Sequence, residues 1–269
     1  MQRTMVVVAS LAPPLFYLVA YRVFRSRTLG VTVVLVYMFT GSVWYFGLFM
    51  AGLYANFLGN LVSLILLYLV MVFVARPRKI LFLLVPAAAL AGYLTHYTVS
   101  LMVLSFAAYI VVLWRVGGVK LRSYIAALEL MVLPALPFII FRFKLVMEFL
   151  AFPSSRAGVI VYEPLFYRQI LNQVSPFLLY LDVHLNSILL SLFLFCVGVA
   201  SVVTVLRRGF PRNPSNWMMF VLVWFLTTWV LAPYNAMAWR FAYYSLLPLT
   251  FLMAFMAHRT LRIVRRNTA

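Results

Sequence analysis

Residues 53–79 read LYANFLGNLVSLILLYLVMVFVARPRK, an apolar run that ends in a basic cluster. The run over 53–75 contains no charged side chain. As a helix it rises about 1.5 Å per residue, which is enough to cross a hydrocarbon core of roughly 30 Å. The Arg76, Arg78 and Lys79 that follow are typical of a cytoplasmic loop. This stretch therefore predicts a transmembrane helix followed by a cytoplasmic turn.

The composition of the whole chain agrees with this interpretation. Of the 269 residues, 66% are hydrophobic and only 10% are charged, and the mean hydropathy is +1.05. A soluble domain is roughly 45–50% apolar and about 25% charged. The excess of apolar surface has to be covered by lipid, so we expect a multi-pass protein of the cell membrane whose first partners are membrane lipids.

The same alternation of apolar run and junction recurs along the chain. It predicts an all-α fold, a single domain over 1–269 that is a bundle of about nine transmembrane helices. The predicted spans are 4–21, 29–50, 53–75, 80–95, 97–114, 124–141, 186–206, 217–232 and 239–258.

The basic residues predict the sidedness of the bundle. Most of them fall at every second junction, which predicts an N-terminus outside the cell and a C-terminus in the cytoplasm. This first set is Arg22, Arg25, Arg27, Arg76, Arg78, Lys79, Arg115, Lys120, Arg122, Arg207, Arg208, Arg212, Arg259, Arg262, Arg265 and Arg266. The net charge of +18 is thus spread over separate junctions rather than gathered on one face, which excludes a nucleic-acid-binding surface.

One outer connection, 142–185, is long and carries most of the acidic residues of the chain. From Pro164 onward its apolar and polar residues separate at helical spacing, which predicts an amphipathic helix resting in the outer interface. We expect the function of the protein to lie on this side.

Few residues have side chains that could act in catalysis or bind a metal ion. Glu129 falls in the first turns of the sixth span, where it is expected to reach the cytoplasmic interface or to pair with an Arg. Asp182 and His184 are too few to define a metal site, and the lone Cys196 excludes a thiolate site and an intramolecular disulfide. We therefore predict no metal ligands.

Arg240 lies at the outer end of the last span, where the positive-inside trend disfavours it. Its guanidinium matches a phosphate in a bidentate manner. Together with Arg142, Lys144, Arg156 and Arg168 it could form a cationic patch for a lipid phosphate. The alternative is an Arg that extends to the outer headgroups.

Three segments resemble a known family. They are Gly52–Asn60 (GLYANFLGN), Leu94–Thr98 (LTHYT) and Arg240–Pro248 (RFAYYSLLP). Together they resemble the membrane portion of GT-C-type glycosyltransferases, which transfer a sugar from a polyprenyl-phosphate carrier to an acceptor on the outer face. The resemblance implies contacts to the lipid phosphate or the sugar from Tyr54, Asn56, His96, Arg142, Lys144, Glu163, Asp182, His184 and Arg240.

The chain departs from that family at one important place. The family carries its catalytic acid on the outer loop after its first helix, whereas here no Asp or Glu precedes Glu129. The resemblance then implies a truncated or split member that lacks the first helix and this acidic loop. A second membrane chain would supply the loop, together with any divalent cation the reaction uses.

Two other functions fit the sequence. A small transporter or permease component fits the number of spans, but it requires polar side chains that converge near the middle of the bilayer. A non-catalytic scaffold subunit fits the low polar content. The catalytic residues, the sugar and the acceptor are not defined by the sequence.

Overall fold

The computed structural model describes residues 10–39, 54–96, 98–117, 119–137, 200, 203, 217–231 and 247–259. Within these residues every regular element is a helix and no strand occurs. The helices are α2 (Ala12–Phe24), α3 (Arg27–Phe39), α5 (Tyr54–Ala75), α6 (Leu81–Thr95), α7 (Thr98–Val116), α8 (Arg122–Val132), the short 3-10 helix η1 (Leu133–Ala135), α13 (Trp217–Leu231) and a helix at 247–259.

The predicted all-α class is confirmed, and several predicted spans coincide with helices. The runs 53–75, 80–95, 97–114 and 217–232 match α5, α6, α7 and α13 to within two residues at either end. Two described helices are long and apolar enough to cross a membrane, at Phe57–Ala75 and Thr98–Val116. The long connection 142–185 lies beyond the described residues, as does all of the span 186–206 except the helical residues 200 and 203.

Two predicted boundaries were wrong, each for a local reason. The first span does not end at 21 but continues to Phe24, because Arg22 is accommodated in the last turn of α2. The helix then closes at Arg25, whose left-handed backbone (φ 51°, ψ 34°) lets its N–H donate to the Tyr21 carbonyl at 2.8 Å. The sixth span is not one regular α-helix over 124–141, because Pro134 has no N–H to donate and the chain tightens into η1.

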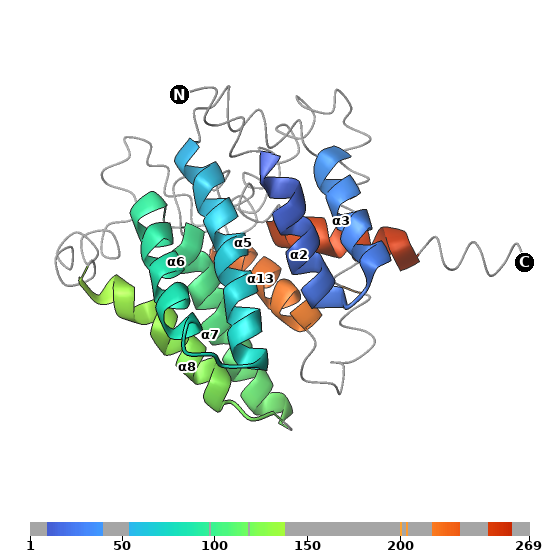
Figure 1. Ribbon diagram of the computed structural model, residues 1–269. Coiled ribbons are helices and arrows are strands. Elements are labelled where there is room, and N and C mark those ends of the chain that lie inside the picture. The colour runs from blue at the N-terminus through green and yellow to red at the C-terminus, as the bar shows by residue number, and fades with distance from the viewer. Residues whose placement is uncertain are drawn as a thin grey trace, which may run out of the picture.

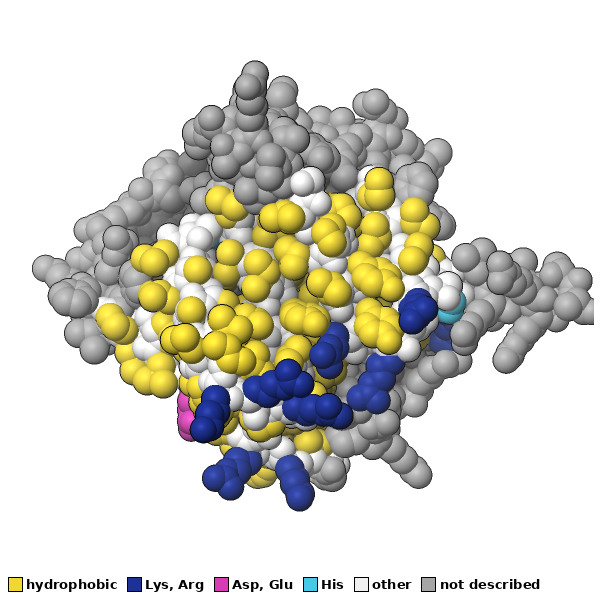
Figure 2. All heavy atoms as spheres, viewed as in Figure 1, with side chains coloured by type: hydrophobic (Ala, Val, Ile, Leu, Met, Phe, Trp, Pro, Cys, Tyr) yellow, Lys and Arg dark blue, Asp and Glu magenta, His cyan; other side chains and the backbone are white. Residues whose placement is uncertain are grey.

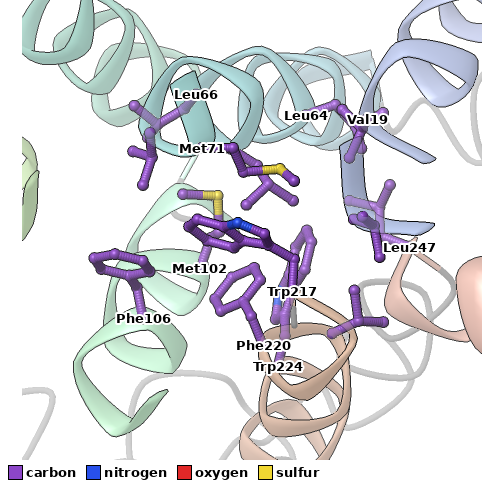
Figure 3. Close-up of a cluster of buried hydrophobic side chains, with 14 of the residues drawn as sticks. Val19, Leu64, Leu66, Met71, Met102, Phe106, Trp217, Phe220, Trp224 and Leu247 are labelled. Atoms are coloured by element: carbon purple, nitrogen blue, oxygen red, sulfur yellow. The ribbon is translucent and has the colours of Figure 1, made fainter. Parts of the chain in front are cut away.

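The core combines many buried Val, Leu and Ala side chains with a group of aromatic and Met side chains. Figure 3 shows Trp217 and Phe220 of α13 pointing toward Met102 of α7 and Met71 of α5. All four are buried. At the other side of the bundle, Phe251 packs on Phe16 of α2 with ring centroids 5.8 Å apart. The helix at 247–259 is thereby joined to the N-terminal helix.

The helices α2, α3, α5, α6 and α7 run side by side, and three connecting turns lie at the same edge of the bundle (Figure 1). These are the turns between α2 and α3, between α5 and α6, and between α7 and α8. We call this edge the basic end, because it carries Arg22, Arg25, Arg27, Arg76, Arg78, Lys79, Arg115, Lys120 and Arg122. Figure 2 shows the Lys and Arg side chains gathered along it, below a broad apolar surface.

Candidate functional site

The predicted site residues fall into two groups. Tyr54 and Asn56 lie in the first turns of α5, and His96 follows the last residue of α6. The remaining candidates lie beyond the described residues, and the cationic patch stays a prediction. These are Arg142, Lys144, Glu163, Asp182, His184 and Arg240.

His96 shapes the tight connection between α6 and α7, as the sequence predicted. It adopts an extended backbone, and its N–H donates to the Gly92 carbonyl at 2.8 Å, which closes α6. Its Nδ1 accepts the Thr98 backbone N–H at 3.3 Å, which opens α7. Through this hydrogen bond the imidazole stabilises the first turn of α7.

The hairpin is tight because Gly92 faces Val99 across it. A Cβ at position 92 would come within 3.0 Å of Val99 Cβ. Tyr93 ties the same end of α6 to α8, since its hydroxyl donates to the Met131 carbonyl at 3.1 Å. The position of His96 is therefore set by packing on two sides.

The start of α5 touches this hairpin directly at Gly59. A Cβ at position 59 would lie 2.8 Å from His96 Cβ and closer still to the Thr98 hydroxyl. Only a glycine permits such an approach without displacement of the hairpin. Two of the three segments quoted from the sequence, Gly52–Asn60 and Leu94–Thr98, are thereby brought into contact.

Beside this contact lie buried polar atoms without hydrogen bonds. Asn60 is 2% exposed, and neither its amide nitrogen nor its carbonyl oxygen has a partner. The buried Thr98 hydroxyl has none either. By contrast, the Ser63 hydroxyl one turn along donates to the Gly59 carbonyl at 2.8 Å. An unpaired polar group in an apolar interior costs about 1–3 kcal/mol.

We call Gly59, Asn60, His96 and Thr98 the His96 end. It lies opposite the basic end, since α5 runs from Tyr54 to Ala75 before Arg76 and α7 runs from Thr98 to Val116. Asn60 precedes Ala75 by fifteen residues, or roughly 22 Å of helix at 1.5 Å per residue. No described Lys or Arg lies at the His96 end.

Asn60 and Thr98 equip the His96 end for hydrogen bonding. Asn60 offers two N–H donors and a carbonyl acceptor, and Thr98 offers a hydroxyl that can do both. Among the described residues no group of three or more His, Cys, Asp or Glu side chains could hold a metal ion. The single described carboxylate, Glu129, is exposed on α8.

Sequence reasoning selected His96 but missed Asn60 and Thr98 as individual contacts. Both lie inside the quoted segments, yet nothing in their spacing predicts that they are buried and unpaired. Gly59 carried a usable signal, because a glycine in an otherwise regular apolar run often marks a close backbone approach.

No protein-family model, no curated protein and no solved structure matches the chain.

Proposed function

We propose that the chain is a cell-membrane protein that crosses the bilayer about nine times, with its N-terminus outside and its basic end in the cytoplasm. The clustering of the basic junctions at one edge of the bundle supports this orientation, because cytoplasmic loops carry an excess of Lys and Arg. Tyr21 and Trp114 add support, since both are exposed at this end, where aromatic side chains favour the lipid headgroups.

The outer surface of the described helices supports the same proposal. Large apolar side chains are exposed along α6 and α7, among them Leu83 (65%), Leu94 (66%) and Val111 (57%). A soluble monomer rarely exposes a contiguous apolar patch larger than a few hundred Å². Lipid chains would cover this surface without cost.

We propose further that the His96 end binds a polyprenyl-phosphate-linked sugar on the outer side of the membrane, as a GT-C-like protein would. The observation that carries this is the contact of Gly59 with His96 and Thr98, beside the unpaired Asn60 amide. Sugar hydroxyls both donate and accept hydrogen bonds, so they would satisfy these buried groups. Arg240, Arg142 and Lys144 would bind the lipid phosphate.

In this proposal the chain binds and orients the sugar donor but does not supply the catalytic acid. A second membrane chain would contribute the acidic outer loop and any divalent cation it holds. Glu163, Asp182 and His184 of the long connection, with Tyr54 and Asn56, would add contacts to the sugar or the lipid phosphate.

The transporter alternative finds no support in three of the buried hydroxyl groups of the described residues. It requires polar side chains that are free to meet a substrate within the membrane. The buried hydroxyls of Ser63, Ser105 and Thr228 instead donate to carbonyls one turn earlier in their own helices, at 2.7–2.8 Å.

Binding of a dolichyl- or undecaprenyl-phosphate sugar to the purified chain in nanodiscs tests the proposal. We expect Arg240→Ala and Asn60→Leu each to weaken binding about tenfold, because one hydrogen bond to a charged or buried group contributes roughly 1.5 kcal/mol. Ser63→Ala is the control, since that hydroxyl is already paired, and it should bind as the unmodified chain does.

The possible outcomes separate the parts of the proposal. Unchanged affinity in Arg240→Ala would remove that residue from the site. Unchanged affinity in Asn60→Leu would show that its amide does not meet the sugar. Absence of any binding by the unmodified chain would refute the proposed function.

A further inference from the structure

The turn between α5 and α6 joins the basic end to an exposed apolar strip. Arg76, Arg78 and Lys79 occupy the turn, and all three are exposed. Leu81, the first residue of α6, is buried, but the residues on either side of it are exposed, large and apolar. They are Ile80 (55%), Phe82 (52%), Leu83 (65%) and Leu84 (41%).

This arrangement differs from the turn between α2 and α3. That turn also carries exposed cations, Arg25 and Arg27, but the first turn of α3 then buries Leu29 and Gly30. The charged turn before α6 is thus followed by three successive exposed apolar side chains, at 82–84, whereas the one before α3 is followed by buried Leu29 and Gly30 and then by a single exposed one, Val31 (50%). Positive charge alone does not distinguish the two turns, but the adjoining apolar surface does.

From this juxtaposition we infer that the α5–α6 turn is a binding site for an anionic phospholipid of the inner leaflet. Arg78 and Lys79 bind its phosphate, and Phe82 and Leu83 pack along its acyl chains. The charge is complementary to the headgroup, because the turn carries three exposed cations and the described residues contain a single carboxylate, Glu129 of α8. Cationic side chains beside an apolar helix face are the usual recognition pattern for such lipids.

A second group of cations lies close enough to reinforce the site. Lys120 and Arg122 stand at the start of α8, which packs against α6, and both side chains are exposed. The starts of α6 and α8 lie at the same edge of the bundle (Figure 1).

The inference rests on the proposed insertion into a membrane but not on the proposed sugar carrier. The two sites lie at opposite ends of α5, so a failure at one leaves the other untouched. The occupant is a lipid rather than free phosphate, because half of the proposed site is apolar.

The test compares lipid retention by the purified full chain in native mass spectrometry and in nanodiscs, using phosphatidylglycerol and phosphatidylcholine with identical acyl chains. We expect preferential retention of phosphatidylglycerol, and an affinity about thirtyfold lower in Arg78→Gln/Lys79→Gln. Each basic side chain near the surface accounts for roughly a fivefold change in affinity. Arg25→Gln/Arg27→Gln removes the same charge from the same end and should change the affinity less than fivefold.

Two further measurements distinguish binding of the whole lipid from binding of its phosphate alone. Phe82→Ser/Leu83→Ser keeps the charge and should still lower phosphatidylglycerol retention, whereas inorganic phosphate should fail to displace the bound lipid. Equal retention of the two lipids, or equal losses in the two double Gln variants, would overturn the inference. Circular dichroism and size-exclusion chromatography establish that each variant is folded, and the Gln pairs replace only exposed side chains.

Discussion

Gly59 is the residue at which α5 meets the hairpin between α6 and α7. Replacement by Ala should destabilise the protein by about 1–2 kcal/mol. The added methyl group must displace His96 and Thr98, an overpacking cost of about 1–3 kcal/mol that exceeds the gain in helix propensity of up to about 1 kcal/mol. The midpoint of unfolding in mixed detergent–SDS micelles measures the change.

Gly30→Ala is the matched control for this substitution. Its added Cβ would meet only the edge of the half-buried Tyr17 ring, at 3.0 Å, and that ring can turn away. We therefore expect Gly30→Ala to be close to neutral. A larger loss of stability in Gly30→Ala than in Gly59→Ala would contradict the close contact at the His96 end.

Tyr93 tests a second contact that holds the hairpin in place. Tyr93→Phe removes the hydroxyl that donates to the Met131 carbonyl and should lower the free energy of unfolding by about 1 kcal/mol. Tyr21→Phe is the comparison, since Tyr21 is 44% exposed. The account of the α6–α8 contact fails if the two variants unfold at the same midpoint.

Only some residues of the candidate site could be predicted from the sequence. His96 was selected from the resemblance and lay between the predicted spans 80–95 and 97–114, and the structure places it in that connection. The meeting of Gly59 with Thr98 depends on how helices distant in sequence pack, which no local pattern encodes. The burial of Asn60 is a result of the same packing.

Among the elements, the helix at 247–259 depends most visibly on one side chain. Phe251 is fully buried and contacts both Phe16 and Phe24 of α2. Phe251→Ala should destabilise the protein by roughly 3 kcal/mol, the lower end of the range of about 3–5 kcal/mol for a buried Phe→Ala change.

Leu83→Ala provides the control for that prediction. Leu83 is the neighbour of buried residues but is itself 65% exposed, so its truncation leaves no cavity. Comparison of the two unfolding midpoints in the same detergent checks the assignment. A similar loss in both variants would mean that the helix at 247–259 is not anchored by Phe251.

Most helix boundaries followed from the sequence because strong local signals set them. The end of α5 at Ala75 was predicted since Arg76 and Pro77 follow. The end of the first span was missed because a terminal Arg can extend its charge out of a helix, as Arg22 does within α2 beside Tyr68. The break at Pro134 was missed because the residues on both sides of the proline are apolar, so the run was long enough to predict one continuous span.

The arrangement of the whole molecule separates two surfaces with different chemistry. Cations and exposed aromatic side chains gather at the basic end, while the buried, unpaired groups of Asn60 and Thr98 lie at the His96 end. The sidedness predicted from the junctions requires that these ends face opposite sides of the membrane. Both the sugar-carrier proposal and the phospholipid inference depend on this requirement.

Labelling of single cysteines tests most directly whether the basic end and the His96 end face opposite sides of the membrane. In a Cys196→Ala background, Thr95→Cys probes the His96 end and Arg78→Cys probes the basic end. A membrane-impermeant maleimide applied to intact cells should label position 95 at once and position 78 only after the membrane is permeabilised. Labelling of position 78 in intact cells, with position 95 protected until permeabilisation, would contradict the account.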